Sequence, residues 1–518
     1  MSPPPGRPKE GSHRSAQHEG MPVSPYTRLC AQWLFPLHER LKGHATLALR
    51  QRLEKSQWAT PAEITAERDQ RLRQFLCHIG ATVPHYKSLF AQLGFNPDVV
   101  RSAADLLALP LLSKADIRAD PQRFLAQGHG PVSRFTTGGS SGEPLIFYMG
   151  LGRKSHDVAA KWRATRWWGV DIGDPELVVW GSPIELGSQD RVRRLRDALM
   201  RSHLLPAFEM SPAKIDGFIA TIRRQRPAML FGYPSSLSLI AAQAERLGVR
   251  IDDVGIRVVF VTSERLYDDQ RATLSRVFGC PVANGYGARD AGFIAHQCPS
   301  GSLHISAEDI VVETVRADGS ATAAGEAGEI VVTHLATDDF PFVRYRTGDV
   351  GILGDERCAC GRGLPVLKEV QGRSTDFVVA QDGTVMHGLA LIYTLRDLPG
   401  IQRFKIEQVS LDETRVQVIA DAGFGAAGRQ RIVQDFKARL GASVRIVVEQ
   451  VEAIDSEASG KFRYVVSRVA AAVAANPGGG ADTDTDTDTD TDTDTDTDPE
   501  SDTAATTASV THADRTHA

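Results

Sequence analysis

Hydrophobic residues near the start of the chain recur at the spacing of amphipathic helices. Between positions 26 and 93 they include Leu29, Trp33, Leu34, Leu37, Leu41, Leu72, Phe75, Leu76 and Ile79. Residues three or four apart share one face of a helix, so several helices are predicted here. Their apolar faces are expected to pack inside the protein. Further on, Ser113 with Asp116 three residues later predicts a helix start.

The middle of the chain alternates short apolar runs with capped helical patterns. Strands are predicted at 145–148, 177–180, 229–232, 257–262 and from Pro281 onward, and helices at 156–168, 211–224, 236–247 and 269–278. This alternation is typical of βαβ units and a mostly parallel sheet. Ligands of such sheets bind at the carboxyl ends of the strands, where this chain has turns rich in Gly, Ser, Thr and Asp.

The pattern changes beyond Gly301. Short strands and frequent turns between 303 and 352 predict an antiparallel, barrel-like region, and the mixed pattern after Gly372 predicts a separate small α+β domain. The predicted fold class is therefore α/β, with a large domain at 25–372, whose mixed but mostly parallel sheets are flanked by helices, and a small domain at 373–475. Residues 1–24 and 476–518 are predicted to be disordered tails, the second because its repeated Asp-Thr pairs repel and contain nothing to bury.

Charge and composition narrow the functional classes. The 518 residues carry a formal net charge of −5, but nearly all of the excess acid lies in the Asp-Thr tail, so the remainder is mildly basic. That balance suits an anionic ligand and does not predict nucleic-acid binding. The first twenty residues lack the apolar segment of a signal peptide, and no stretch is long enough to span a membrane. A cytoplasmic location is expected.

A glycine-rich stretch at 135–144 is the first candidate for binding chemistry. Its glycines allow a close backbone approach, and its hydroxyl and amide groups can bind a polyphosphate, although an ordinary turn has the same composition. It lacks the Gly-Lys-Ser/Thr ending of a P-loop, which disfavours that class of ATPase.

The cysteines fall into two groups. Cys30, Cys77 and Cys280 are isolated, so a disulfide framework is not expected. The remaining cysteines lie near a histidine and offer the ligand set of a closed tetrahedral zinc site: Cys298, His304, Cys358 and Cys360. Free thiols and a redox disulfide are the alternatives. Four protein ligands leave no open position, so such a zinc would be structural rather than catalytic.

Five short motifs in order resemble adenylate-forming enzymes. They are 136–144, Gly-Tyr-Gly-Ala-Arg-Asp at 285–290, Arg-Tyr-Arg-Thr-Gly-Asp at 344–349, Gly-Arg at 372–373 and Ser-Gly-Lys-Phe-Arg at 459–463. Together with 232–235 and 262–264 they are most similar to the phenylacetate-CoA ligase branch, which includes CapK-like capsule-biosynthesis and coenzyme F390 synthetase-like members. The resemblance covers 72–466. Some members of this branch bind zinc at similar positions.

The resemblance implies a site for ATP and its AMP product. The residues that match are Thr136, Thr137, Gly138, Ser140, Ser141, Gly142, Glu264, Tyr286, Gly287, Asp349 and Arg373. In this family the loop holds the phosphates. Tyr286 offers a flat face to adenine, and the carboxylate of Asp349 accepts hydrogen bonds from both ribose hydroxyls.

The remaining implied roles concern metal, hinge and catalysis. Asp290 lies where the family has a glutamate that holds Mg²⁺; a surface ion pair with Arg289 is the alternative for it. The pivot of the small domain is expected at Thr375 or Asp376, where relatives tend to have paired aspartates. Lys461 matches the lysine that bridges the substrate carboxylate and the α-phosphate, and is predicted to be catalytic.

The predicted function is ATP-dependent activation of a carboxylic acid to an acyl-AMP, followed by transfer to coenzyme A. Two steps with different needs imply two arrangements of a mobile small domain. AMP transfer to a hydroxyl and a non-catalytic nucleotide-binding role in polysaccharide biosynthesis are the alternatives. The acid pocket is expected within 180–183, 231–235 and 261–263. The oligomeric state is left open, with a homodimer as one option.

Overall fold

A computed structural model describes residues 24–137, 145–180, 191–207, 212–373, 377–382, 385–387, 389–454 and 463–469. All of them belong to the first of two units of the chain, Met1–Pro477 and Gly478–Ala518. Seven predicted site residues lie outside the described residues: Gly138, Ser140, Ser141, Gly142, Thr375, Asp376 and Lys461. The domain boundaries and tails stay predictions.

The first hundred described residues are helical, as predicted. The elements are α1 (Pro25–Leu29), the π-helix η1 (Cys30–Leu34), α2 (Phe35–Leu41), α3 (Thr46–Ser56), α4 (Pro61–Thr82), α5 (Pro84–Leu93), η2 (Pro97–Val99), η3 (Ala103–Ala108), α6 (Lys114–Ala119) and η4 (Pro121–Phe124). Ser113 begins α6 through a reciprocal capping box with Asp116, which confirms that predicted start.

The prediction that every apolar face of these helices is buried is wrong for the first one. Four residues of its stripe are 45, 70, 57 and 79% exposed: Leu29, Trp33, Leu37 and Leu41. The opposite face of this helix is buried. Its residue Cys30 packs so closely on Gly173 that a Cβ added to Gly173 would lie 2.3 Å from the Cys30 Cβ. Helical spacing identifies a face but not what covers it. In α4 the predicted stripe from Leu72 to Ile79 is buried.

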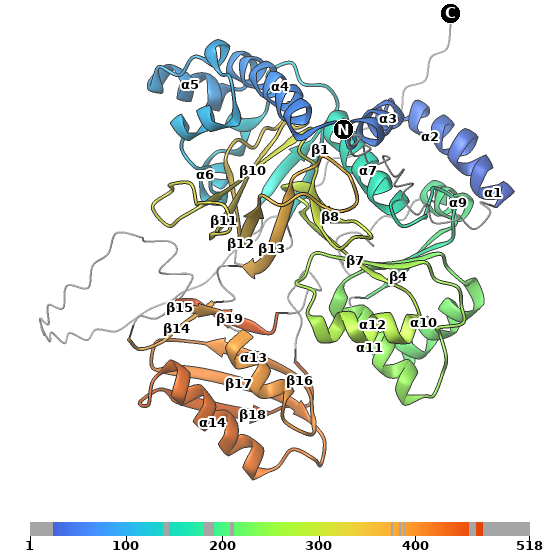
Figure 1. The fold of residues 1–518 in the computed structure, drawn as a ribbon, viewed down its shortest axis with the longest axis vertical. Coiled ribbons are helices and arrows are strands. Elements are labelled where there is room, and N and C mark those ends of the chain that lie inside the picture. The colour runs from blue at the N-terminus through green and yellow to red at the C-terminus, as the bar shows by residue number, and fades with distance from the viewer. Residues whose placement is uncertain are drawn as a thin grey trace, which may run out of the picture. The chain divides into compact units, whose positions relative to one another are not determined.

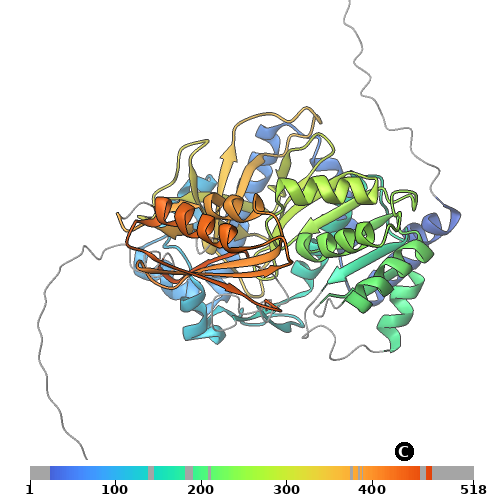
Figure 2. The same ribbon diagram turned by 90° about the horizontal axis from the view of Figure 1, so that it is seen from below.

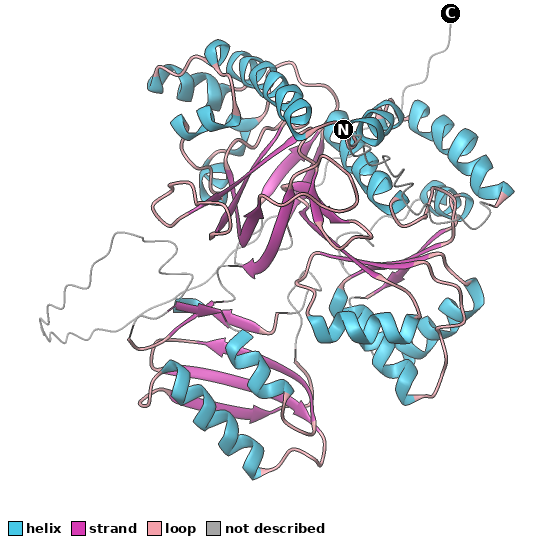
Figure 3. Cartoon of the chain, viewed as in Figure 1, coloured by secondary structure: helices cyan, strands magenta, loops and turns pink. Residues whose placement is uncertain are grey.

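Among the described residues, eleven strands form one mixed sheet (Figures 1 and 3). Its parallel half contains β4 (Ser202–Pro206), β3 (Glu176–Trp180), β5 (Met229–Gly232), β6 (Val258–Thr262) and β7 (Val282–Ala288). Its antiparallel half continues through β8 (Gly292–Gln297), β9 (Leu303–Ile305), β13 (Val366–Arg373), β12 (Tyr345–Gly354), β11 (Ala327–His334) and β10 (Ile310–Val315). The region predicted to be barrel-like is thus hydrogen-bonded into the main sheet.

Helices cover both faces of the parallel half. On one side lie α10 (Pro212–Gln225), α11 (Pro234–Arg246) and α12 (Asp268–Phe278), with a core that includes Val179, Leu230 and Val261 (Figure 1). On the other side α7 (Leu151–Arg166) contributes Ala164 beside Phe260. The short helix α9 (Arg191–Leu199) precedes β4. The predicted strand at 145–148 is β2 (Ile146–Met149), which pairs with β1 (Ser133–Thr136) in a separate ribbon.

A small C-terminal α+β domain follows, as predicted. Its four-stranded sheet has the order β18 (Arg445–Gln450), β17 (Glu413–Ala420), β16 (Ile401–Gln408), β19 (Val465–Ser467). Helices α13 (Leu389–Arg396) and α14 (Ala426–Leu440) cover one face of this sheet (Figure 2), and β14 (Phe377–Val379) pairs with β15 (Val385–His387). No described helix of the chain is long and apolar enough to cross a membrane.

Candidate active site and candidate metal centre

Two predicted nucleotide-binding residues, on strands β7 and β12 of the large sheet, contact each other. The Tyr286 hydroxyl on β7 donates a hydrogen bond to Asp349 Oδ2 on β12, at 2.9 Å. The Asp349 backbone N–H donates to Thr347 Oγ1, which orients the turn before it. Burial and the negative charge of Asp349 raise the pKa of Tyr286 well above its usual value, so the phenol remains a donor. Asp349 is also paired with Arg373 in the β12–β13 register, so three predicted residues are close together.

Asp290 is a buried carboxylate with defined partners. Its Oδ2 accepts a hydrogen bond from the Tyr345 hydroxyl at 2.5 Å and lies 3.7 Å from Lys114 Nζ. Arg153 donates to the backbone carbonyls of Arg289 and Asp290, which fixes this turn. Asp290 is only 4% exposed, so its carboxylate lies inside the protein.

The ends of the glycine-rich loop are tied together. Thr137 Oγ1 accepts a hydrogen bond from the Leu145 N–H at 2.9 Å, and the Thr137 N–H donates to the Leu145 carbonyl. Arg289 Nη1 donates to the Thr136 carbonyl. The motif at 285–290 therefore contacts the start of the loop, as two parts of one phosphate site would require.

The turn after β6 joins two further motifs. Glu264 Oε2 accepts a hydrogen bond from the Ser235 N–H at the start of α11. Ser263, between β6 and Glu264, has φ of +71°, a backbone conformation that non-glycine residues rarely adopt. Strain of this kind persists where the surrounding structure requires it and is concentrated at functional sites.

A cavity of about 380 Å³ opens beside β3, β5, β6 and β7. Trp180, Phe231, Thr262 and Ser263 line it, and all four lie in the segments predicted for the acid pocket. Tyr233, also within those segments, is instead a core residue that packs against the Trp180 ring. Gly287, Ala288 and Arg289 line the same cavity directly after Tyr286 on β7.

Sequence reasoning missed four charged residues of the cavity: Lys161 and Asp157 on α7, and Arg196 and Asp197 on α9. Lys161 Nζ lies 2.6 Å from Glu176 Oε1 and 4.6 Å from the centre of the Phe231 ring. Residues four apart on α7 face the same side, a spacing that could have indicated a polar stripe. What it faces depends on how the helix packs on the sheet.

Asp157 belongs to a buried charge network. His156, Asp157 and His334 have possible ligand atoms within 4.8 Å of one another. Both Asp157 oxygens, however, accept hydrogen bonds from Arg153, and His334 Nδ1 accepts one from the Ala336 N–H, so neutral His334 carries its proton on Nε2. The positive charge of Arg153 and the Nε2 proton of His334 make the cluster of His156, Asp157 and His334 a poor cation site.

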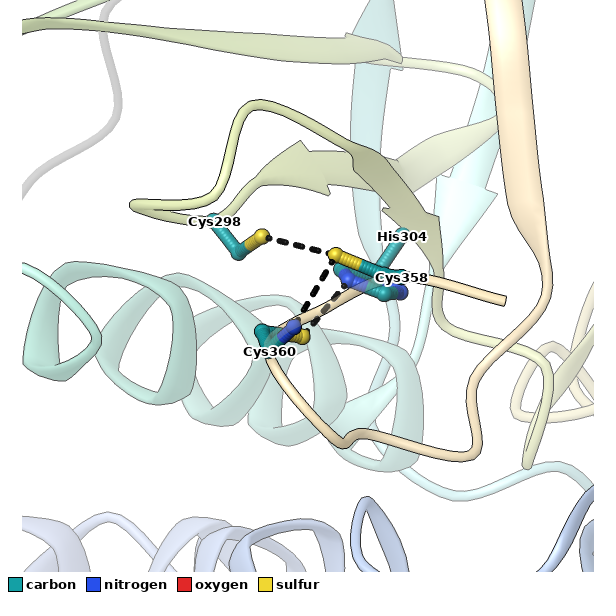
Figure 4. Close-up of side chains that lie close together, drawn as sticks. All are labelled: Cys298, His304, Cys358 and Cys360. Atoms are coloured by element: carbon teal, nitrogen blue, oxygen red, sulfur yellow. Dashed lines mark hydrogen bonds between the residues drawn. The ribbon is translucent and has the colours of Figure 1, made fainter. Parts of the chain in front are cut away.

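The four residues of the candidate zinc site do come together (Figure 4). The Sγ atoms of Cys298 and Cys358 are 3.6 Å apart, and Cys360 Sγ lies 3.2 Å from His304 Nε2. Their ligand atoms all fall within 4.8 Å of one another. The pairing of His304 on β9 with Val366 on β13 closes the long sequence separation between the two halves.

The donor set fits zinc. Tetrahedral bonds of about 2.3 Å to sulfur place two sulfurs somewhat less than 4 Å apart, which is close to the Cys298–Cys358 separation. His304 Nδ1 lies 3.1 Å from the Leu364 carbonyl, which fixes the proton on Nδ1 and leaves Nε2 free to bind a metal. Burial lowers the pKa of His304, which favours the neutral imidazole.

Three comparisons place this architecture among known proteins. The family model of the CapK C-terminal domain matches residues 378–468. Protein CapK of Staphylococcus aureus is 22% identical over 77% of this chain and 88% of its own length, and the phenylacetate-coenzyme A ligase of Aromatoleum evansii is 24% identical over 80% and 97%. The chain is a homologue of CapK and of phenylacetate-coenzyme A ligases. The predicted resemblance is confirmed.

The fold of these adenylate-forming enzymes is confirmed as well. The crystal structure of 2-hydroxyisobutyryl-CoA ligase in the postadenylation state, in complex with R3-HIB-AMP, has a TM-score of 0.65 at 20% identity, covering 82% of this chain and 93% of its own. The described motif residues lie on or directly after β1, β6, β7, β12 and β13. The roles predicted for them stay predictions.

Proposed function

We propose that the protein is an AMP-forming acid–coenzyme A ligase. A carboxylate oxygen of the acid attacks the α-phosphorus of ATP, the bond to pyrophosphate breaks, and acyl-AMP forms. The thiolate sulfur of coenzyme A then attacks the acyl carbon, and AMP leaves with the carboxyl oxygen. The homologous ligases and the shared fold support this reaction type.

One feature of β7 carries the proposal. Tyr286 is hydrogen-bonded to Asp349, while the next three residues line the cavity. A nucleotide whose ribose is held by Asp349 and an acid held in the cavity would therefore meet at Gly287. The backbone is tightly packed at this position, since a Cβ added to Gly287 would lie 2.3 Å from the Gly292 carbonyl oxygen. Proximity of this kind is what an in-line attack requires.

The residues around the phosphates have separate roles in this proposal. Thr136 and Thr137 hold the loop ends in register, and Arg289 adds positive charge beside Thr136. Asp290 is the residue that would hold Mg²⁺, a hard cation that prefers carboxylate oxygens and neutralises phosphate charge. Lys461 would bring an ammonium group to the reacting oxygen.

The cavity favours an acid with an apolar or aromatic body. Trp180, Phe231 and Phe293 contribute ring surface to it, with the half-buried Lys161 among its cations. Because Lys161 is already paired with Glu176, it does not require a second negative charge on the acid. A monocarboxylic acid fits this balance best.

Zinc is proposed at the Cys298, His304, Cys358 and Cys360 cluster as a structural ion. It would tie the turn after β8 to the segment between β12 and β13, using ligands that the backbone already brings together. The set supplies four ligands, so no position remains for a reacting water.

Acid-dependent exchange of labelled pyrophosphate into ATP tests the first half-reaction. A panel of aromatic, aliphatic and dicarboxylic acids is assayed, and products formed with coenzyme A are identified by mass. Exchange with at least one monocarboxylic acid, with one free AMP per acyl-CoA, is expected. Absence of exchange across the panel would overturn the proposal. A stable adenylylated hydroxyl product would overturn the choice of acceptor.

A further inference from the structure

The first helix presents an apolar stripe to solvent. Its seventeen residues, Pro25–Leu41, run through α1, η1 and α2 without a break. Leu29, Trp33, Leu37 and Leu41 lie on the exposed side, and Trp33 and Leu41 are 70 and 79% exposed. Single exposed leucines are ordinary, but large side chains repeated along one helix mark an interaction surface.

The π turn keeps this stripe in line. In a regular α-helix, residues four apart are offset by about 40°, so four such positions would spread around about a third of the circumference. The wider turn at η1 contains more residues per turn, which rotates the later positions back. The apolar side chains therefore form one band rather than a spiral.

A second helix, which contacts the first one on its Cys30 side, carries two more exposed leucines. The Tyr26 hydroxyl donates to the Leu199 carbonyl at 2.8 Å, so the start of α1 lies against the end of α9 (Figure 1). Leu195 and Leu199 on α9 are 62 and 43% exposed. Arg196 and Asp197, which lie between these two leucines in the sequence, line the 380 Å³ cavity. Helix α9 thus connects the first helix with the wall of the candidate acid pocket.

The exposed charges on the first helix itself have one sign. Arg28, Arg40 and Lys42 are exposed on or beside the helix, and Arg201 packs on the Tyr26 ring. The one acidic residue between positions 24 and 44, Glu39, is buried and bonded to His44. The surface therefore combines Trp and Leu side chains with basic residues, which is the composition of helices that lie in a membrane interface.

Other occupants fit less well. The chain ends outside the described residues, 1–23 and 470–518, contain no Leu, Ile, Phe, Trp or Tyr, and Met1 and Met21 are their only large apolar residues. A second copy would bring like charges together around the same band. We propose that the stripe formed by Leu29, Trp33, Leu37 and Leu41 docks the protein reversibly on an anionic lipid surface.

Vesicle sedimentation of the full chain tests this. Vesicles of phosphatidylcholine alone are compared with vesicles that contain about one-third phosphatidylglycerol. The test variant is Trp33→Gln/Leu37→Gln/Leu41→Gln, since Gln preserves helix propensity. Its matched control removes three exposed apolar residues elsewhere, Val99→Gln/Leu107→Gln/Leu247→Gln. A second variant, Arg40→Gln/Lys42→Gln, is matched by Arg224→Gln/Arg439→Gln.

We expect binding to the anionic vesicles, about tenfold or more weaker in the apolar triple variant and unchanged in its control. Loss of Arg40 and Lys42 should weaken anionic-vesicle binding by about thirtyfold, because each basic residue near such a surface adds attraction. Failure of the wild-type chain to bind, or equal binding by both triple variants, would overturn the proposal. So would a solution dimer that only Trp33→Gln/Leu37→Gln/Leu41→Gln dissociates, since a second copy would then cover the stripe.

Discussion

Removing the metal from the Cys298, His304, Cys358 and Cys360 cluster should destabilise the large domain by a predictable amount. A link between Cys298 and Cys358 closes a loop of 60 residues. Closing a loop of that length lowers the entropy of the unfolded chain by the equivalent of about 4 kcal/mol at 25 °C. The metal binds only where the ligands are brought together, so most of this stabilisation depends on it.

The expected effect can be measured as a melting temperature. A domain of about 350 residues unfolds with an entropy near 0.7 kcal/mol/K, so losing about 4 kcal/mol lowers its melting temperature by about 6 °C. Zinc content is determined by mass spectrometry before and after chelation, with melting followed by scanning calorimetry. Cys360→Ser should lose zinc and much of this stability. Cys77→Ser, which alters a cysteine outside the cluster, should lose neither.

Two results would refute the reasoning. Protein purified from zinc-supplemented growth that contains less than about one-tenth of a zinc per chain would show that the thiols do not hold this metal. Complete zinc removal without a change in melting temperature would show that the ion does not stabilise the fold. A mass decrease of two hydrogens in place of bound zinc would identify a disulfide instead.

Three further outcomes are expected. Tyr286→Phe removes a hydrogen bond to the charged Asp349 and should raise KM for ATP about tenfold, whereas Tyr148→Phe, at a half-exposed hydroxyl, should not. Lys461→Ala should slow acid-dependent pyrophosphate exchange at least about a hundredfold and leave acyl transfer from supplied acyl-AMP intact; equal losses in both half-reactions would contradict its role in adenylation. Burial, reinforced by nearby Arg163, lowers the pKa of His296 to about 3 in the folded protein. The contribution of neutral His296 to folding stability is therefore complete above the unfolded-state pKa near 6.5, and it is lost as the pH falls from 6.5 toward 3. Denaturant unfolding should therefore lose about 1.4 kcal/mol per pH unit from this residue below pH 6.5, and His296→Phe should remove that part of the slope.

The motif residues could be predicted because their chemistry is local. Asp349 follows a Thr-Gly turn, and Gly348 has the positive φ of +77° that this turn needs. The cavity walls Trp180, Phe231 and Ser263 follow from strand ends, since parallel strands direct their carboxyl ends to one edge. Lys161 could not be found in the same way, because the side of α7 that meets the cavity depends on helix–sheet packing.

The sequence by itself determined the alternation of strands and helices, the order of the motifs and the identity of the four possible zinc ligands. These depend on backbone periodicity and side-chain chemistry, which a linear sequence contains. Only the tertiary structure decided that Cys298 and Cys358 are adjacent, through β9–β13 pairing, and that Trp33 faces solvent. The physical reason is that periodicity specifies which residues share a face, whereas burial and ligand geometry depend on which distant element packs against it.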